Sequence, residues 1–144
     1  MTEQIFPYAN IVVGVLVLIV GGLLHWLGQL VAWLNWDLAT KIGVAEKKII
    51  PEYRDYERGI AAADSLLGWI YVIAAIGVTM NISWAYKLLW FPGVVMIYHA
   101  LSFWFWTNNQ TKAGRAVNSL TFRIIWVSAN ALTGGLALLL AWRS

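Results

Sequence analysis

Four long runs of apolar residues, separated by polar connections, form the main pattern of the chain. The runs cover roughly residues 8–36, 61–81, 88–106 and 119–142. Each is close to the ~20 residues that a helix needs to cross the hydrocarbon core of a bilayer. None shows the alternation of apolar and polar positions that is typical of a barrel strand. The pattern predicts an all-α integral membrane protein, a single domain over residues 1–144 with four transmembrane helices in a bundle.

The connection between the first two runs also carries a helical pattern. Apolar side chains recur there at helical spacing, at Leu34, Leu38, Ile42, Ala45 and Ile49. This spacing predicts that the first helix continues beyond the membrane as far as Pro51, where a further helix begins, because Pro is tolerated in a first turn. We expect a helical cytoplasmic extension between helices 1 and 2. It either projects as a hairpin or lies on the bilayer surface as an amphipathic segment.

The distribution of Lys and Arg predicts the orientation. Eight of the ten lie in the first and third connections or just beyond them, and the other two are Lys87 and Arg143. Positively charged connections stay in the cytoplasm. We therefore expect both termini outside, with a bacterial inner (cytoplasmic) membrane as the location.

Composition supports a membrane protein and excludes several functions. Charged residues make up 12% of the chain, whereas a soluble domain carries roughly a quarter. The absence of Cys excludes disulfide bonds, thiolate metal sites and Cys nucleophiles. A net charge of +3 is too small to indicate nucleic acid as a partner. The expected partners are the lipid bilayer and either other subunits of a membrane complex or further copies of the chain.

The only two histidines, His25 and His99, both lie inside apolar runs. Runs one and three cross in the same direction, and at 1.5 Å per residue the two histidines lie roughly 18 and 12 Å from the cytoplasmic end, within one layer. Two imidazoles at matched depth are what bis-His ligation of a b-type haem requires, so both are candidate metal ligands. Gly21, one turn before His25, would let a flat macrocycle approach the backbone.

The Gly21–His25 spacing indicates a second candidate cofactor. This small-xxx-His pattern resembles the chlorophyll-binding helices of light-harvesting proteins, and the resemblance implies a chlorin in place of haem. Two other interpretations of the histidines stay open. They either form plain hydrogen bonds between helices or handle protons or substrate.

Two further polar side chains are expected in the same layer. Tyr71 lies about ten residues into the second run, and Asn130 lies near the middle of the fourth. Together with the histidines they predict a ligand pocket or a proton-conducting set. The alternative is a polar core layer whose groups satisfy one another.

Asp64 and Arg123 are expected to form a structural ion pair. Each lies about one turn inside its run, on the predicted cytoplasmic side. Equal depth favours a pair between runs two and four. The alternative is that Arg123 extends to the headgroups while Asp64 caps a helix.

These patterns lead to one principal functional hypothesis and two alternatives. The principal one is a small integral membrane subunit of a larger complex, with one haem or chlorin between His25 and His99 serving electron transfer or pigment binding. The alternatives are a small oligomeric transporter or channel that uses the polar layer, and a lipid- or quinone-modifying membrane enzyme. Because no sizeable soluble domain is present, we expect no autonomous catalysis.

Overall fold

The computed structural model describes residues 5–45, 51–115 and 118–144, and every regular element in these residues is a helix. Four helices are long and apolar enough to cross a membrane, which confirms this part of the predicted fold. They cover Ala9–Leu34, Tyr53–Thr79, Ser83–Lys112 and Leu120–Trp142. The second and third extend further than the apolar runs, because polar residues at 53–60 and 107–112 continue the same helices.

The first long helix changes its winding along its length. It begins as α1 (Ala9–Leu16), continues as the π-helical segment η1 (Val17–Leu27), and ends as α2 (Gly28–Leu34). π-helical winding is rare and is often found at functional sites. Segment η1 contains His25 and the Gly21–Gly22 pair, so the wider winding coincides with the residues that the sequence marks as candidates.

The expected continuation of this helix to Pro51 is wrong. Asn35 leaves the helical conformation, with φ −147° and ψ 88°, and its side chain accepts a hydrogen bond from the Leu38 backbone N–H at 3.0 Å. It thereby caps the short helix α3 (Trp36–Lys41), which is followed by a turn with positive φ at Gly43. Ile49 lies outside the described residues. A helix, α4 (Pro51–Leu67), does begin at Pro51 as predicted.

The remaining elements complete three long helices. Helix α4 passes through Gly68 into α5 (Trp69–Thr79), and α6 (Ser83–Leu88) passes through Leu89 into α7 (Trp90–Lys112). The fourth long helix is α8 (Leu120–Trp142), capped by the Ser119 hydroxyl, which accepts from the Phe122 N–H.

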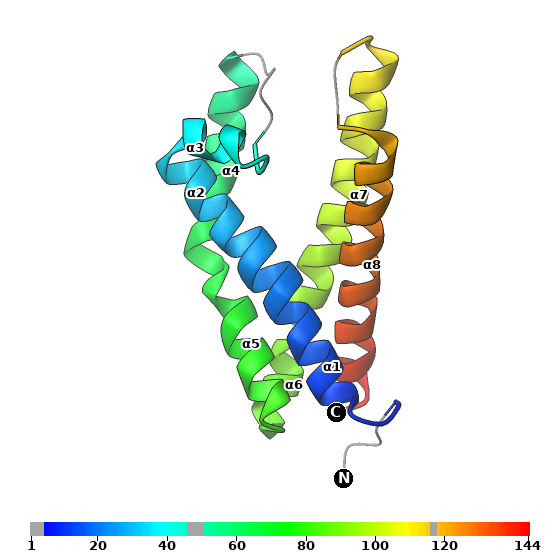
Figure 1. The fold of residues 1–144 in the computed structure, drawn as a ribbon. Coiled ribbons are helices and arrows are strands. Elements are labelled where there is room, and N and C mark those ends of the chain that lie inside the picture. The colour runs from blue at the N-terminus through cyan, green and yellow to red at the C-terminus, as the bar shows by residue number, and fades with distance from the viewer. Residues whose placement is uncertain (1–4, 46–50, 116–117) are drawn as a thin grey trace.

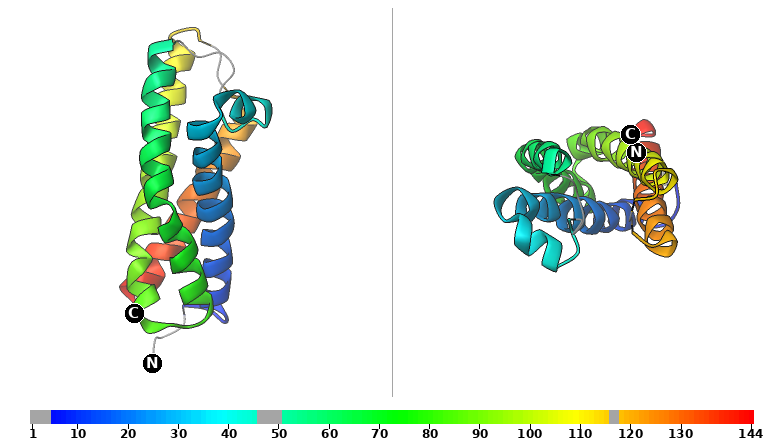
Figure 2. Two further views of the ribbon diagram at one scale, coloured as in Figure 1. Left: turned by 90° about the vertical axis from the view of Figure 1, so that its left-hand side faces the viewer. Right: turned by 90° about the horizontal axis from the view of Figure 1, so that it is seen from above.

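The four long helices lie side by side, and consecutive ones run in opposite directions, so both chain ends lie at the same end of the molecule (Figure 1). At that end all four helices pack together, whereas at the other end α2, α3 and α4 diverge from α7 and α8 (Figures 1 and 2). Near the divergent end Tyr53 on α4 stacks on Trp106 of α7, with ring centroids 5.3 Å apart. This contact joins the two sides there.

The largest apolar cluster fills the half of the molecule that holds the termini. Side chains with no exposed surface meet there from all four long helices, among them Val13, Val17, Val78, Leu89, Met96 and Ala137. Glycines allow the close approaches. A Cβ on Gly134 would lie 2.9 Å from the Gly93 carbonyl oxygen, so α7 and α8 touch backbone to backbone. The polar layer lies at the edge of this cluster, towards the divergent end.

Candidate functional site

The centre of the polar layer is His25, which η1 directs into the molecule with only 5% of its surface exposed. Its Nε2 atom lies 2.5 Å from Oδ1 of Asn130 on α8. Its ring lies 4.6 Å from the ring of His99 on α7 and 6.2 Å from that of Tyr71 on α5. The structure therefore brings together all four polar side chains that the sequence placed at one depth.

Asn130 determines which nitrogen of His25 carries a proton. Its Nδ2 donates to the Trp126 carbonyl oxygen at 2.9 Å, four residues earlier on the same helix. Because a carbonyl can only accept, this contact fixes the amide with Oδ1 towards His25. Since Oδ1 also only accepts, Nε2 of His25 must donate. In the neutral ring Nδ1 is then the acceptor.

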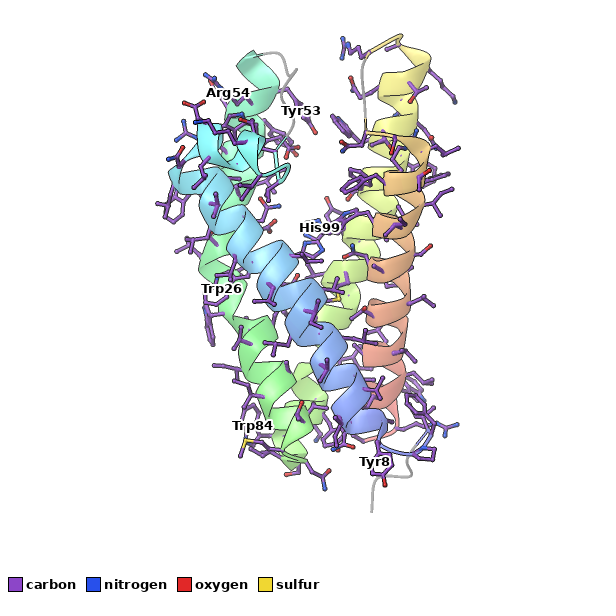
Figure 3. All side chains as sticks on the ribbon, viewed as in Figure 1. Tyr8, Trp26, Tyr53, Arg54, Trp84 and His99 are labelled. Carbon is purple, nitrogen blue, oxygen red and sulfur yellow. The ribbon has the colours of Figure 1, made fainter. Side chains whose placement is uncertain are left out.

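The second half of the site is formed by His99 and Asp64. Nε2 of His99 lies 3.7 Å from Oδ2 of Asp64, and among the described residues no other Lys, Arg or His nitrogen lies within 4 Å of a carboxylate oxygen. Figure 3 shows the His99 side chain lying between α7 and the first long helix. Oδ2 of Asp64 is buried and accepts no hydrogen bond from the described residues. A buried carboxylate oxygen of this kind is costly unless a cation or a proton compensates it.

A cavity of about 70 Å³ lies beside these groups. Its polar lining comes from four side chains, His25, Asp64, Tyr71 and His99, and its apolar lining includes Leu67, Phe91 and Val95. At ~10–15 Å³ for each water, the cavity has room for several waters in contact with titratable groups. The site can therefore hold water beside groups that bind and release protons.

The predicted pair of Asp64 and Arg123 is not formed. Arg123 has only 5% of its surface exposed and is held by the neighbouring helix α7, where it donates to Asn108 and, at 3.5 Å, to Thr111. Its guanidinium carbon also lies 5.2 Å from the centroid of the Trp104 ring. Residues 107–112, which follow the third apolar run, continue α7, and this extension supplies partners for Arg123. Asp64 therefore pairs with His99.

The geometry around His25 and His99 does not fit a macrocycle clamped between their rings. The centroids are only 4.6 Å apart, with the planes inclined by 48°, and both Nε2 atoms already face partners, Asn130 and Asp64. The space expected above Gly21 is filled, because a Cβ there would lie 2.7 Å from Cε of Met96 and closer still to the Tyr71 ring. Gly21 thus serves packing. No group of three or more His, Asp or Glu in the described part of the chain could hold a metal ion.

The anchoring of η1 by Trp26 is a feature of the site that has no clear signal in the sequence. Trp26, next to His25, donates from its indole N–H to the Ser65 carbonyl oxygen at 2.9 Å and packs against Gly68. It thereby ties η1 to the joint between α4 and α5, one turn from Asp64.

No protein-family model, curated protein or solved structure matches the chain.

Proposed function

We propose that the chain is a small integral membrane protein that carries protons, alone or together with a substrate, through the groups Asp64, His99 and His25. It would act as an oligomer or as a subunit of a larger membrane complex, since four candidate membrane spans make up most of the residues that the structure describes. The observation that carries the proposal is the Asp64–His99 pair beside a cavity of about 70 Å³ inside a candidate membrane span, with one buried carboxylate oxygen of Asp64 that accepts no hydrogen bond from the described residues.

A membrane location is supported by the outer surfaces of the long helices. Large apolar side chains are exposed along all four, including Leu23, Ile76, Leu101 and Leu132. Extended apolar surface of this kind is unfavourable in water and favourable in contact with lipid tails.

Proton handling is supported by the identity and order of the polar groups. Ionisable side chains inside membrane spans are costly, and where they occur they commonly form proton relays. Here a carboxylate, an imidazole and a second imidazole follow one another, with 3.7 Å between the first two and 4.6 Å between the ring centroids. The neutral His25 ring offers Nδ1 as the next proton acceptor, because Nε2 is engaged by Asn130.

The apolar cluster favours a carrier over an open channel. Val17, Val78, Leu89 and Met96, all without exposed surface, close the molecule between the polar layer and the end that holds the termini. A proton on His25 would therefore need a change of conformation to leave on that side. A carrier with alternating access undergoes such a conformational change. The position of the site between two helix pairs that diverge is consistent with this mechanism.

The test is proton flux into liposomes that contain the purified protein and a trapped pH-sensitive dye, under an imposed membrane potential. We expect a flux above that of protein-free liposomes, reduced about tenfold or more in Asp64→Asn and His99→Gln, since one relay step contributes at least that factor. Asp55→Asn is the matched control, because Asp55 is exposed on the same helix. Flux equal to that of empty liposomes, with or without candidate substrates, would contradict the proposal.

An absorption spectrum tests the cofactor hypothesis in the same preparation. The proposal expects no Soret band in protein purified from its native host. A Soret band that disappears in both His25→Ala and His99→Ala would instead favour haem or chlorin ligation, with the helices rearranged around the cofactor.

A further inference from the structure

A second polar cavity lies where the first long helix breaks, between this break and α4. It has a volume of about 290 Å³ and is lined by Leu34, Asn35, Trp36, Asp37, Arg54 and Arg58. Arg54 and Arg58 are one turn apart on α4 and so lie on one face of that helix. Figure 3 shows Arg54 beside α3 at the divergent end of the molecule.

The charges in this cavity favour an anion. Two guanidinium groups face one carboxylate, that of Asp37. Arg58 uses one N–H group to donate to the Trp33 carbonyl oxygen, in the last turn of α2, at 3.3 Å. A guanidinium has five N–H donors, so most of those of Arg58 remain for a ligand. Arg54 is exposed and makes no hydrogen bond or ion pair with the described residues.

The depth of the cavity points to the headgroup layer. Leu34 is the last residue of the first candidate span, and the cavity begins there. Trp33 and Trp36 flank the break, and Trp is the residue that settles at the membrane interface. The excess of Lys and Arg places this end at the cytoplasmic leaflet, where anionic lipids are found.

We propose that this cavity binds the phosphate group of an anionic phospholipid, with Arg54 and Arg58 as the two ligands. Arg is suited to this role because its planar fork contacts two phosphate oxygens at once. Asp37 sets a limit on the affinity, because its carboxylate repels the phosphate. The inference rests on the membrane location proposed above but not on proton transport.

The test is a binding titration of the purified full chain in detergent, read by native mass spectrometry, with phosphatidylglycerol and phosphatidylcholine as the two lipids. We expect phosphatidylglycerol to bind at least tenfold more tightly, since two surface cations contribute roughly that factor or more. The Arg54→Gln/Arg58→Gln variant should lose the preference. Arg54→Gln alone should reduce it several-fold, and Asp37→Asn should increase it.

The matched control is Lys112→Gln/Arg115→Gln, which removes two exposed charges at the same end of the molecule but outside the cavity. An equal loss of preference in this control would overturn the proposal, because it would indicate attraction without a site. Inorganic phosphate is the second arm. For this arm the midpoint of thermal unfolding of the purified chain is measured with inorganic phosphate and with phosphatidylglycerol. If both raise the midpoint equally, the cavity takes a soluble phosphate and the lipid proposal fails. Neither readout depends on proton flux, so this proposal and the proposed function can fail separately.

Discussion

At the scale of single residues, Asn130 has the largest influence on the polar layer. It has no exposed surface, its Nδ2 is committed to the Trp126 carbonyl, and its Oδ1 receives the Nε2 proton of His25. A side chain that could also donate at this point, such as a carboxylic acid, would permit the other tautomer. The choice of Asn therefore directs the accepting nitrogen of His25 away from α8.

This assignment predicts a nuclear magnetic resonance signature. Protein labelled with ¹⁵N-histidine should show His25 as the neutral Nε2–H tautomer, and the two histidine signals can be assigned with His99→Gln. Asn130→Leu should release the fixed tautomer and cost about 0.5–2 kcal/mol of unfolding free energy, since the donor at His25 loses its partner. An unchanged spectrum in Asn130→Leu would show that the hydrogen bond is not formed.

A second prediction at this scale concerns the partner of Asp64. Double-mutant cycles with Asp64→Asn should give a coupling energy with His99→Gln of about 0.5–2 kcal/mol, because the two groups are 3.7 Å apart. The cycle with Arg123→Gln should give a coupling close to zero, because Arg123 is held by Asn108, Thr111 and Trp104. Unfolding in a denaturing detergent measures both cycles. Coupling to Arg123 but not to His99 would restore the pair expected from the sequence.

At the scale of elements, hydropathy predicted which segments form long apolar helices. It did not predict where the backbone changes direction or which way a side chain points around a helix. The four apolar helices followed from run length, because lipid requires about 20 apolar residues per crossing. The break at Asn35 was missed because apolar spacing continues through it, while one side-chain oxygen redirects the backbone. Depth along a helix gave the common layer of His25 and Asn130. It could not give the direction around the helix axis, so Asp64 was assigned to Arg123, although both Arg123 and His99 lie within reach in depth.

Glycine contacts between α7 and α8 provide the prediction for this scale. Gly134→Ala should cost about 1–3 kcal/mol of unfolding free energy, since the new Cβ would lie 2.9 Å from the Gly93 carbonyl oxygen, which cannot move away as a side chain can. Gly135→Ala is the matched control. Its Cβ would meet no atom within 4 Å, so it should be neutral or stabilise by up to ~1 kcal/mol through helix propensity. Equal effects of the two changes would show that α7 and α8 do not pack at Gly134.

At the scale of the whole molecule, the arrangement of the helices gives the relative position of the two chain ends, and the distribution of charge predicts their side of the membrane. The arrangement places both chain ends together, at the end where all four long helices pack (Figure 1). Four membrane crossings would therefore bring the N- and C-termini to the same side of the membrane. The arrangement does not say which side this is. The Lys and Arg content of the connections predicts the orientation, because positively charged connections tend to stay in the cytoplasm.

The resulting topology prediction also determines what the two cavities face. Reporter fusions at Ser144 should indicate an outside location, and fusions after Lys48 and after Gly114 should indicate the cytoplasm. Termini on opposite sides would contradict the four crossings. Both termini in the cytoplasm would preserve the fold but invert it, and Arg54 and Arg58 would then face the outer leaflet. With the predicted orientation, the phosphate cavity and the open side of the Asp64–His99 site both face the cytoplasm, so protons would enter the relay from that side and leave past Val17 and Met96.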